Sequence, residues 1–338
     1  MLKEQNRIGA EERIAPVFDF IYLLRIIAAI LITNSHYEAI YPHSMIANGG
    51  LLGDVIFFAV SGFCLFPVKQ GFPKWYGRRL KRIYPLVWII TLIYLLFGFY
   101  QANSVKTFVK LLVYPTYYHF VASIILLYIV FYVVARILQS EPKLFARRFF
   151  AIITVLVIAY GVIYGTVYDR SFYHIDTVRE PMIEFLYFLA MMIGLWFRHN
   201  KERYLGHGKA WPWLAALFLF AAYFASKLAF SRGMISSDYQ FLNQIILLLL
   251  LLCLFRGFVG LENKLNHMPR KLHGAMAFVA GFAFEIYLVQ YALIPRLNLG
   301  PFPVNFLLVS GAIFLSALAL HKLNGRVMVI IEKHGSRS

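Results

Sequence analysis

An arginine and a histidine stand in the first long apolar segment of the chain, YLLRIIAAILITNSH at residues 22–36. Arg25 and His36 are eleven residues apart. Because an α-helix turns about 100° per residue, their side chains would share one face, about 16 Å apart along the axis. A charge inside a membrane span costs about 2.5–3.5 kcal/mol on insertion scales, so Arg25 is a functional candidate. His36, near the end of the segment, is a candidate general base.

The second apolar segment, GDVIFFAVSGFCL at residues 53–65, carries Asp54 and Ser61 at a spacing that also keeps one helical face. If the two segments are antiparallel, Asp54 lies opposite His36 and Ser61 lies near the depth of Arg25. A carboxylate beside a histidine orients the ring and raises its basicity, so Asp54 is the predicted partner of His36. The residues alone leave open a simpler interpretation, in which His36 is an interfacial residue and Asp54 a helix-end residue.

A compact basic segment, WYGRRLKRIYP at residues 75–85, follows the second apolar segment. Arg79 and Arg82 share a face if the segment is helical. Guanidinium groups bind phosphate in a bidentate manner, so the pair suits a ligand that carries phosphate. The alternative is that the positive charge only fixes the orientation of the chain in the membrane.

Two more polar residues, Glu285 and His119, fall within or beside apolar segments. Glu285 must be paired or protonated, and its simplest role is to partner a buried cation such as Lys227 or Arg25. His119 is an interfacial residue unless the fold brings it to the first span. The sequence has two cysteines and no histidine or acid spacing typical of a metal site, so no metal is predicted.

The composition indicates which elements must position these residues. Of 338 residues, 60% are hydrophobic and 14% charged, and the mean hydropathy is +0.67. A soluble domain has about 45–50% apolar and about 25% charged residues, so the composition excludes a disordered chain and argues against a water-soluble enzyme. The net charge is +17, and the basic residues lie between long apolar runs. This pattern favours a polytopic membrane protein, with anionic lipid or a phosphorylated ligand at its basic face, over a protein that binds nucleic acid.

Ten apolar runs are long enough to approach the roughly 20 residues that span a bilayer core. They predict an all-α polytopic membrane protein with about ten transmembrane helices, in one domain over 1–338 with short tails at 1–16 and 324–338. The predicted spans are 17–34, 50–67, 83–100, 118–138, 149–168, 183–198, 211–230, 238–256, 273–294 and 303–323.

Basic residues are distributed unevenly between the two sets of connecting segments. Of the 33 lysines and arginines, 24 fall in or beside the tails and the loops on their side, 6 in the opposite loops and 3 inside spans. Positive residues favour the cytoplasmic side. The sequence therefore predicts that both termini are cytoplasmic.

Four segments together resemble the acyltransferase-3 family of bacterial integral-membrane O-acyltransferases. YLLRIIAAILITNSH is similar to the family's first helix, in which an arginine and a histidine are separated by ten residues. GDVIFFAVSGFCL is similar to the family's second helix. RRLKRIYPLVW at 78–88 resembles the family's Arg-x-x-Arg loop, and FAFEIYLVQYAL at 282–293 its late Tyr-Leu helix. The four segments occur in family order.

The resemblance implies an O-acetyltransferase of the bacterial inner membrane. It would transfer acetyl from acetyl-CoA, a donor substrate and not a bound cofactor, to a hydroxyl of a surface polysaccharide such as capsule or lipopolysaccharide O-antigen, or of its lipid-linked precursor. His36, Arg25 and Asp54 would be catalytic, and Arg79, Arg82 and Ser61 would bind the donor. Glu285, His119 and Tyr287 would support the site. A homo-oligomer is left open.

The sequence departs from the family pattern at three positions. The acid that is common three residues before the arginine is replaced by Tyr22, with Asp19 six residues before it. The late helix has Gln290 where a histidine is frequent, and His119 is followed by Phe120 without the usual tryptophan. The last two departures weaken a role for Gln290 and for His119. Two functions of other classes are left open by the sequence, a glycan or lipid exporter and a non-catalytic subunit of a polysaccharide-assembly complex.

Overall fold

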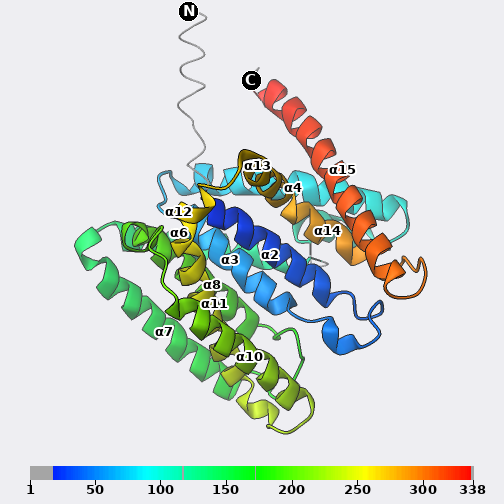
Figure 1. The fold of residues 1–338 in the computed structure, drawn as a ribbon. Coiled ribbons are helices and arrows are strands. Elements are labelled where there is room, and N and C mark those ends of the chain that lie inside the picture. Colours follow the sequence, from blue (N-terminus) through cyan, green and yellow to red (C-terminus); the bar gives the residue numbers. More distant parts are fainter. Residues whose placement is uncertain (1–17, 116–117, 172, 336–338) are drawn as a thin grey trace, which may run out of the picture.

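The chain folds into a bundle of long helices (Figure 1). The structure, a computed structural model, describes residues 18–115, 118–171 and 173–335, and these residues contain helices but no strand. The start of the first helix and the end of the last lie toward the same side of the molecule (Figure 1). The predicted all-α fold class is confirmed. The predicted tail at 1–16 lies outside the described residues, whereas the last helix continues through most of the tail predicted at 324–338.

A helix stands at each of the ten predicted ranges, and shorter helices occupy several predicted loops. In chain order the helices are α2 (Asp19–Ser35), η1 (Ser44–Ile46), α3 (Gly50–Leu65), α4 (Phe72–Leu96), α5 (Val105–Val113), α6 (His119–Gln139), η2 (Pro142–Leu144), α7 (Phe145–Thr166), α8 (Met182–His199), α9 (Lys201–Tyr204), α10 (Trp211–Ser231), η3 (Ser237–Tyr239), α11 (Phe241–Gly260), α12 (Glu262–Leu265), α13 (Arg270–Gly281), α14 (Ala283–Leu293) and α15 (Val304–Gly335).

Seven segments of the described chain are long and apolar enough to cross a membrane, or eight if the bent pair α13–α14 forms one span. This pair bends by 53° at Phe282. The exact count of about ten is therefore not confirmed. α2 has 17 residues, which reach only about 26 Å along the axis. α4 begins at Phe72, so its first turns carry the basic residues that were predicted to lie in a loop.

Three helices pack at backbone distance in the centre of the bundle. A Cβ atom on Gly194 of α8 would lie 1.8 Å from the carbonyl oxygen of Ala59 in α3. On Gly62 of α3 it would lie 2.0 Å from the carbonyl oxygen of Met191, and on Gly53 2.8 Å from that of Ala28 in α2. Small residues permit such close helix contacts in membranes, where van der Waals packing drives association. The glycines therefore fix how α2, α3 and α8 lie against one another.

The helices α7 and α10 lie at the edge of this core (Figure 1). Only 11% of the apolar window of α7 and 22% of that of α10 is buried within the chain. Large apolar side chains such as Phe150 and Phe218 are exposed on them. Because a bilayer solvates apolar side chains, these two helices present a lipid-facing surface.

Replacing Gly194 by alanine should destabilise the bundle, because the added methyl group collides with the backbone of α3. Overpacking of this kind costs about 1–3 kcal/mol. The matched control is Gly165→Ala in α7, where an added Cβ would meet nothing within 4 Å. Thermal unfolding of both variants in the same detergent measures the effect. Equal midpoints for the two variants would show that the α3–α8 contact is not tight.

Candidate active site

The helix α2 carries both ends of the site. It begins where Glu262 accepts hydrogen bonds from the backbone N–H groups of Asp19 (3.1 Å) and Phe20 (3.0 Å). These bonds satisfy two amides that a helix leaves unpaired at its start. The helix ends at Ser35, so Arg25 lies within it and His36 directly follows it. We call the end of the bundle where α2 begins the basic end, and the opposite end the His36 end.

Arg25 is half-buried in a cluster of charged and polar side chains. It interacts electrostatically with Cys64 and Glu285, and with Tyr22 and Arg82. A lone charge within apolar helices is costly, and three of these neighbours, Cys64, Glu285 and Tyr22, are acidic or weakly acidic and compensate it in part, whereas Arg82 adds a second positive charge. The structure therefore brings two predicted residues, Arg82 and Glu285, to the predicted residue Arg25.

Tyr128 of α6 lies beside the Arg25 cluster and shares two neighbours with it, Cys64 and Arg82. Its hydroxyl hydrogen-bonds to Ser61, and the side chain interacts electrostatically with Arg79, Cys64 and Arg82. The predicted donor-binding residues Ser61, Arg79 and Arg82 are thus gathered around one tyrosine. Cys64 is exposed. Neither Tyr128 nor Cys64 was among the residues predicted for the site.

Arg79 and Arg82 lie on the helix α4, which begins at Phe72. The predicted sharing of one face by the two arginines required that this segment be helical. The guanidinium of Arg79 lies 4.2 Å from the centre of the Trp75 ring and donates to the Trp75 carbonyl oxygen over 2.8 Å. Burial, together with the nearby Arg82 and Arg78, lowers the pKa of Arg79 to about 10. Arg79 therefore stays charged at neutral pH, and Arg82 is exposed.

A further arginine, Arg198 at the end of α8, faces the same region. Its Nε atom donates to the Phe66 carbonyl oxygen over 3.2 Å, and its guanidinium lies 5.1 Å from the ring centre of Phe18 and 5.2 Å from that of Phe63. It also interacts electrostatically with Cys64. Sequence reasoning counted Arg198 only as a basic loop-edge residue, because its aromatic neighbours are distant in the chain.

Glu285 is buried and its Oε1 atom lies 2.6 Å from Nδ1 of His321 in α15. Arg25 and Lys227, the two cations predicted as partners of Glu285, differ in their contacts. Arg25 interacts with Glu285 electrostatically, whereas Lys227 pairs with Asp176 at 2.5 Å. Glu285 therefore links α14 to α15 beside the Arg25 cluster.

At the His36 end the predicted partner of His36 is engaged elsewhere. Asp54 accepts a hydrogen bond of 2.9 Å from the Tyr187 hydroxyl, and its other oxygen is buried without a partner in the described chain. Tyr287 interacts electrostatically with Asp54. No hydrogen bond between His36 and Asp54 occurs among the described residues. The structure places Asp54 with Tyr187 and Tyr287, so its role toward His36 stays a prediction.

His36 itself is exposed, with the ring of Tyr291 edge-on at 6.3 Å between centroids. The surrounding protein lowers the pKa of His36 through desolvation, and the negative charge of Asp176 partly opposes this shift. A lowered pKa keeps the imidazole neutral at physiological pH. The neutral form is the one that accepts a proton, so the environment suits a general base.

His119 does not join either group of residues. Its Nε2 atom lies 2.9 Å from Oε1 of Glu180, and both side chains are largely exposed. This surface pair agrees with the interpretation of His119 as an interfacial residue. Its predicted supporting role is not tested by this contact.

The arrangement can hold an anion at one end and accept a proton at the other. Arginines at the basic end provide donors for phosphate oxygens. The neutral imidazole of His36 lies about 16 Å farther along α2. Such a division suits a reaction between a phosphorylated donor and an acceptor that arrive from different ends.

Comparison with known families shows which family the chain belongs to. A family model described as an acyltransferase domain, Acyl_transf_3, matches residues 18–322. No curated protein and no solved structure matches the chain. The family match covers nearly the whole chain and both ends of the site. The chain therefore belongs to the acyltransferase-3 family and is a membrane acyltransferase.

Proposed function

We propose that the protein transfers acetyl from acetyl-CoA to a hydroxyl of a bacterial surface polysaccharide or of its lipid-linked precursor. Its place is the bacterial inner membrane, with the basic end in the cytoplasm, where coenzyme A is found. The excess of lysine and arginine at that end supports this orientation. The one observation that carries the proposal is the gathering of three arginines at the basic end, because Arg82 and Cys64 are neighbours both of Arg25 on α2 and of Tyr128, which lies beside Arg79.

The donor binds by its phosphates at the basic end. Arg79 is fixed by its contacts with Trp75, and the exposed Arg82 lies in the same cluster. A guanidinium group held in one position beside a second guanidinium group matches the phosphates of coenzyme A better than mobile ammonium groups do. The pantetheine arm then runs past Arg25, Ser61 and Cys64 toward His36.

The reaction takes place at the His36 end. His36 accepts the proton of the acceptor hydroxyl, and the oxygen attacks the thioester carbonyl carbon. The carbon–sulfur bond breaks, and the departing thiolate of coenzyme A receives the proton from the imidazolium. Arg25, about 16 Å away along the axis, holds the donor arm and does not contact the reacting carbonyl.

The acceptor reaches His36 from the opposite side of the membrane. His36 is exposed beyond the end of α2. The loops at this end are short and carry few basic residues. A polysaccharide or lipid-linked glycan in the outer half of the membrane therefore meets the acetyl group without crossing the bilayer.

Replacing His36 by alanine should abolish acetyl transfer, because the loss of a general base lowers the rate by about 10²–10⁴-fold. The matched control is His43→Ala, which removes an exposed histidine of the following loop. Chemical analysis of the surface glycan in the native bacterium, with each variant in place of the wild type, measures the effect. Wild-type acetylation in the His36→Ala strain would remove His36 from the mechanism.

The same glycan analysis distinguishes the classes of function. A strain that lacks the protein should make a glycan that is complete except for its ester. If the glycan itself is missing from the surface, the protein is an exporter or a part of the assembly complex and the proposal is wrong.

Replacing both Arg79 and Arg82 by glutamine should raise the KM for acetyl-CoA about tenfold or more, because each charge-assisted hydrogen bond contributes about 1.5–3 kcal/mol. Acetylation in membrane preparations over a range of acetyl-CoA concentrations gives the KM. Lysine at both positions should restore binding only in part, because the bidentate geometry is lost.

A control with the same loss of charge separates binding from membrane orientation. Lys74 and Lys81 are exposed residues of α4 and belong to neither the Arg25 nor the Tyr128 cluster. The double variant Lys74→Gln, Lys81→Gln should leave the KM unchanged. Equal effects of the two double variants would show that the arginines act only through their charge.

A further inference from the structure

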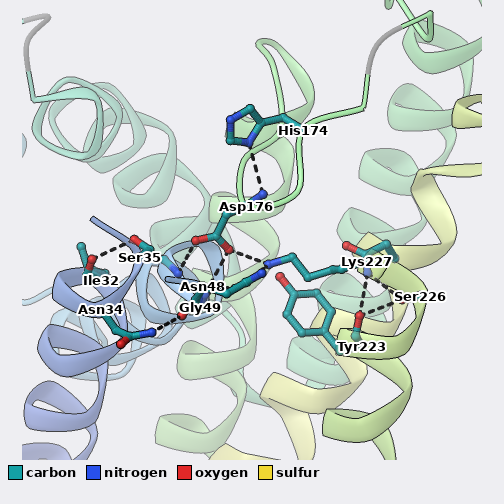
Figure 2. A network of polar contacts seen from close by, with 12 residues as sticks. Ile32, Asn34, Ser35, Asn48, Gly49, His174, Asp176, Tyr223, Ser226 and Lys227 are labelled. Atoms are coloured by element: carbon teal, nitrogen blue, oxygen red, sulfur yellow. Dashed lines mark hydrogen bonds and ion pairs between the residues drawn. The ribbon is translucent and has the colours of Figure 1, made fainter. Parts of the chain in front are cut away.

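A buried lysine and a loop aspartate form the centre of a polar network at the His36 end (Figure 2). Lys227 of α10 is 1% exposed, and its Nζ atom lies 2.5 Å from Oδ1 of Asp176. Nζ also donates to Oδ1 of Asn48. Asp176 stands in the segment before α8, so this network joins parts of the chain that are far apart in sequence.

The Asp176 carboxylate also caps the start of α3. It accepts a hydrogen bond of 3.2 Å from the Gly49 amide and one of 2.7 Å from the Gly50 amide. The start of a helix favours negative charge and has unpaired N–H groups. A Cβ on Gly50 would lie 2.9 Å from Oδ2 of Asp176 and 2.5 Å from Oγ of Ser35, so only glycine leaves room for this approach. Both oxygens of the carboxylate are therefore held in place.

The same residues hold the end of α2. The Asn34 side-chain amide donates to the carbonyl oxygens of Asn48 (2.9 Å) and Ile46 (2.8 Å). Asn34 precedes His36 by two residues, and Ser35 packs against Gly50. The position of His36 is thus coupled, through Asn34 and Asn48, to the network around Asp176.

An acidic partner for His36 is needed if the imidazole is to carry a proton during the reaction. Asp54, the carboxylate expected from the sequence, is bonded to Tyr187. Asp176 lies beside the end of α2, because its Oδ2 atom and Oγ of Ser35, the residue before His36, both lie within 3.0 Å of the Cβ position of Gly50. Its negative charge opposes the lowering of the pKa of His36. The ring of Tyr291 from α14 lies against that of His36. The other titratable residues on the elements that meet at this end are Asp176 in the segment before α8, Asp54 of α3, Lys227 of α10 and Glu38 in the loop after α2.

We propose that Asp176, fixed by Lys227 and by the start of α3, is a positioning residue that stabilises the protonated form of His36 during acyl transfer. This inference rests on the proposed function. When His36 takes the proton of the acceptor hydroxyl, Asp176 stays ionised, and its negative charge stabilises the imidazolium. The negative charge of Asp176 keeps the proton on His36 until the thiolate leaves. Lys227 neutralises the carboxylate from the side of α10 and thereby permits its burial.

The test measures His36 directly in the full-length protein without substrates. Diethyl pyrocarbonate modifies neutral imidazole, so the pH dependence of modification of the His36 peptide, read by mass spectrometry, gives a midpoint for this residue. The variant Asp176→Asn, Lys227→Met removes both charges and leaves no lone buried charge. Its midpoint should fall by about 0.5 pH unit or more, because a negative charge that favours the imidazolium is lost. Acetyl transfer should fall about tenfold with an unchanged KM for acetyl-CoA.

Two further variants keep the test decisive. Asp169→Asn removes an exposed acid of the same segment, which is bonded to Ser171 and Arg179, and should leave the midpoint unchanged. Lys227→Met alone leaves Asp176 without its counter-charge, so the midpoint should rise. This opposite shift provides the test if the double variant does not fold.

The outcomes separate this inference from the proposed function. An unchanged His36 midpoint in the folded double variant, or an unchanged or lowered one in Lys227→Met, overturns the inference. If the midpoints shift as expected but His36→Ala transfers acetyl normally, Asp176 is still the partner of His36 and the proposed function is wrong.

Discussion

The structure depends on the constraint that a charge inside an apolar bundle needs a compensating group. Lys227 is compensated by Asp176, and Glu285 by His321. Arg25 lies among Cys64, Tyr22 and Glu285. Apart from Tyr22, which lies on α2 with Arg25, each partner stands on a helix or loop that is distant in sequence. The cost of an unpaired charge in a membrane therefore fixes the arrangement of the helices that carry the site.

Local patterns in the sequence were sufficient to predict the helices and which residues lie close together at the basic end. The apolar runs locate a helix at each predicted span because a membrane helix satisfies its own backbone hydrogen bonds. The helical spacing of Arg79 and Arg82 and the depth argument for Arg25 and Ser61 predicted residues that do gather in one cluster. The predicted count of about ten spans is not confirmed, because α2 is short and the α13–α14 pair is bent.

Contacts between distant segments could not be predicted in the same way. Depth alone placed Asp54 opposite His36, but rotation of α3 brings its carboxylate to Tyr187 of α8. Lys227 was conspicuous as a charge in a span, yet nothing in the loop at 169–181 marks Asp176 as its partner. The glycines that set the α3–α8 distance carry no periodic signal, because a close approach depends on both helices. These features follow from tertiary packing.

The central claim is that one helix connects a donor site at the basic end to a base at the other end, with the donor arm running between them. Cys64 lies beside this path and is exposed, whereas Cys253 is buried in α11 and serves as an internal control. The most direct measurement is the rate of alkylation of Cys64 in the purified protein, with and without coenzyme A, followed by peptide mass spectrometry. The account predicts that coenzyme A slows alkylation of Cys64 in the wild type but not in the Arg79→Gln, Arg82→Gln variant. An unchanged rate at Cys64 in the wild type at saturating coenzyme A would contradict it.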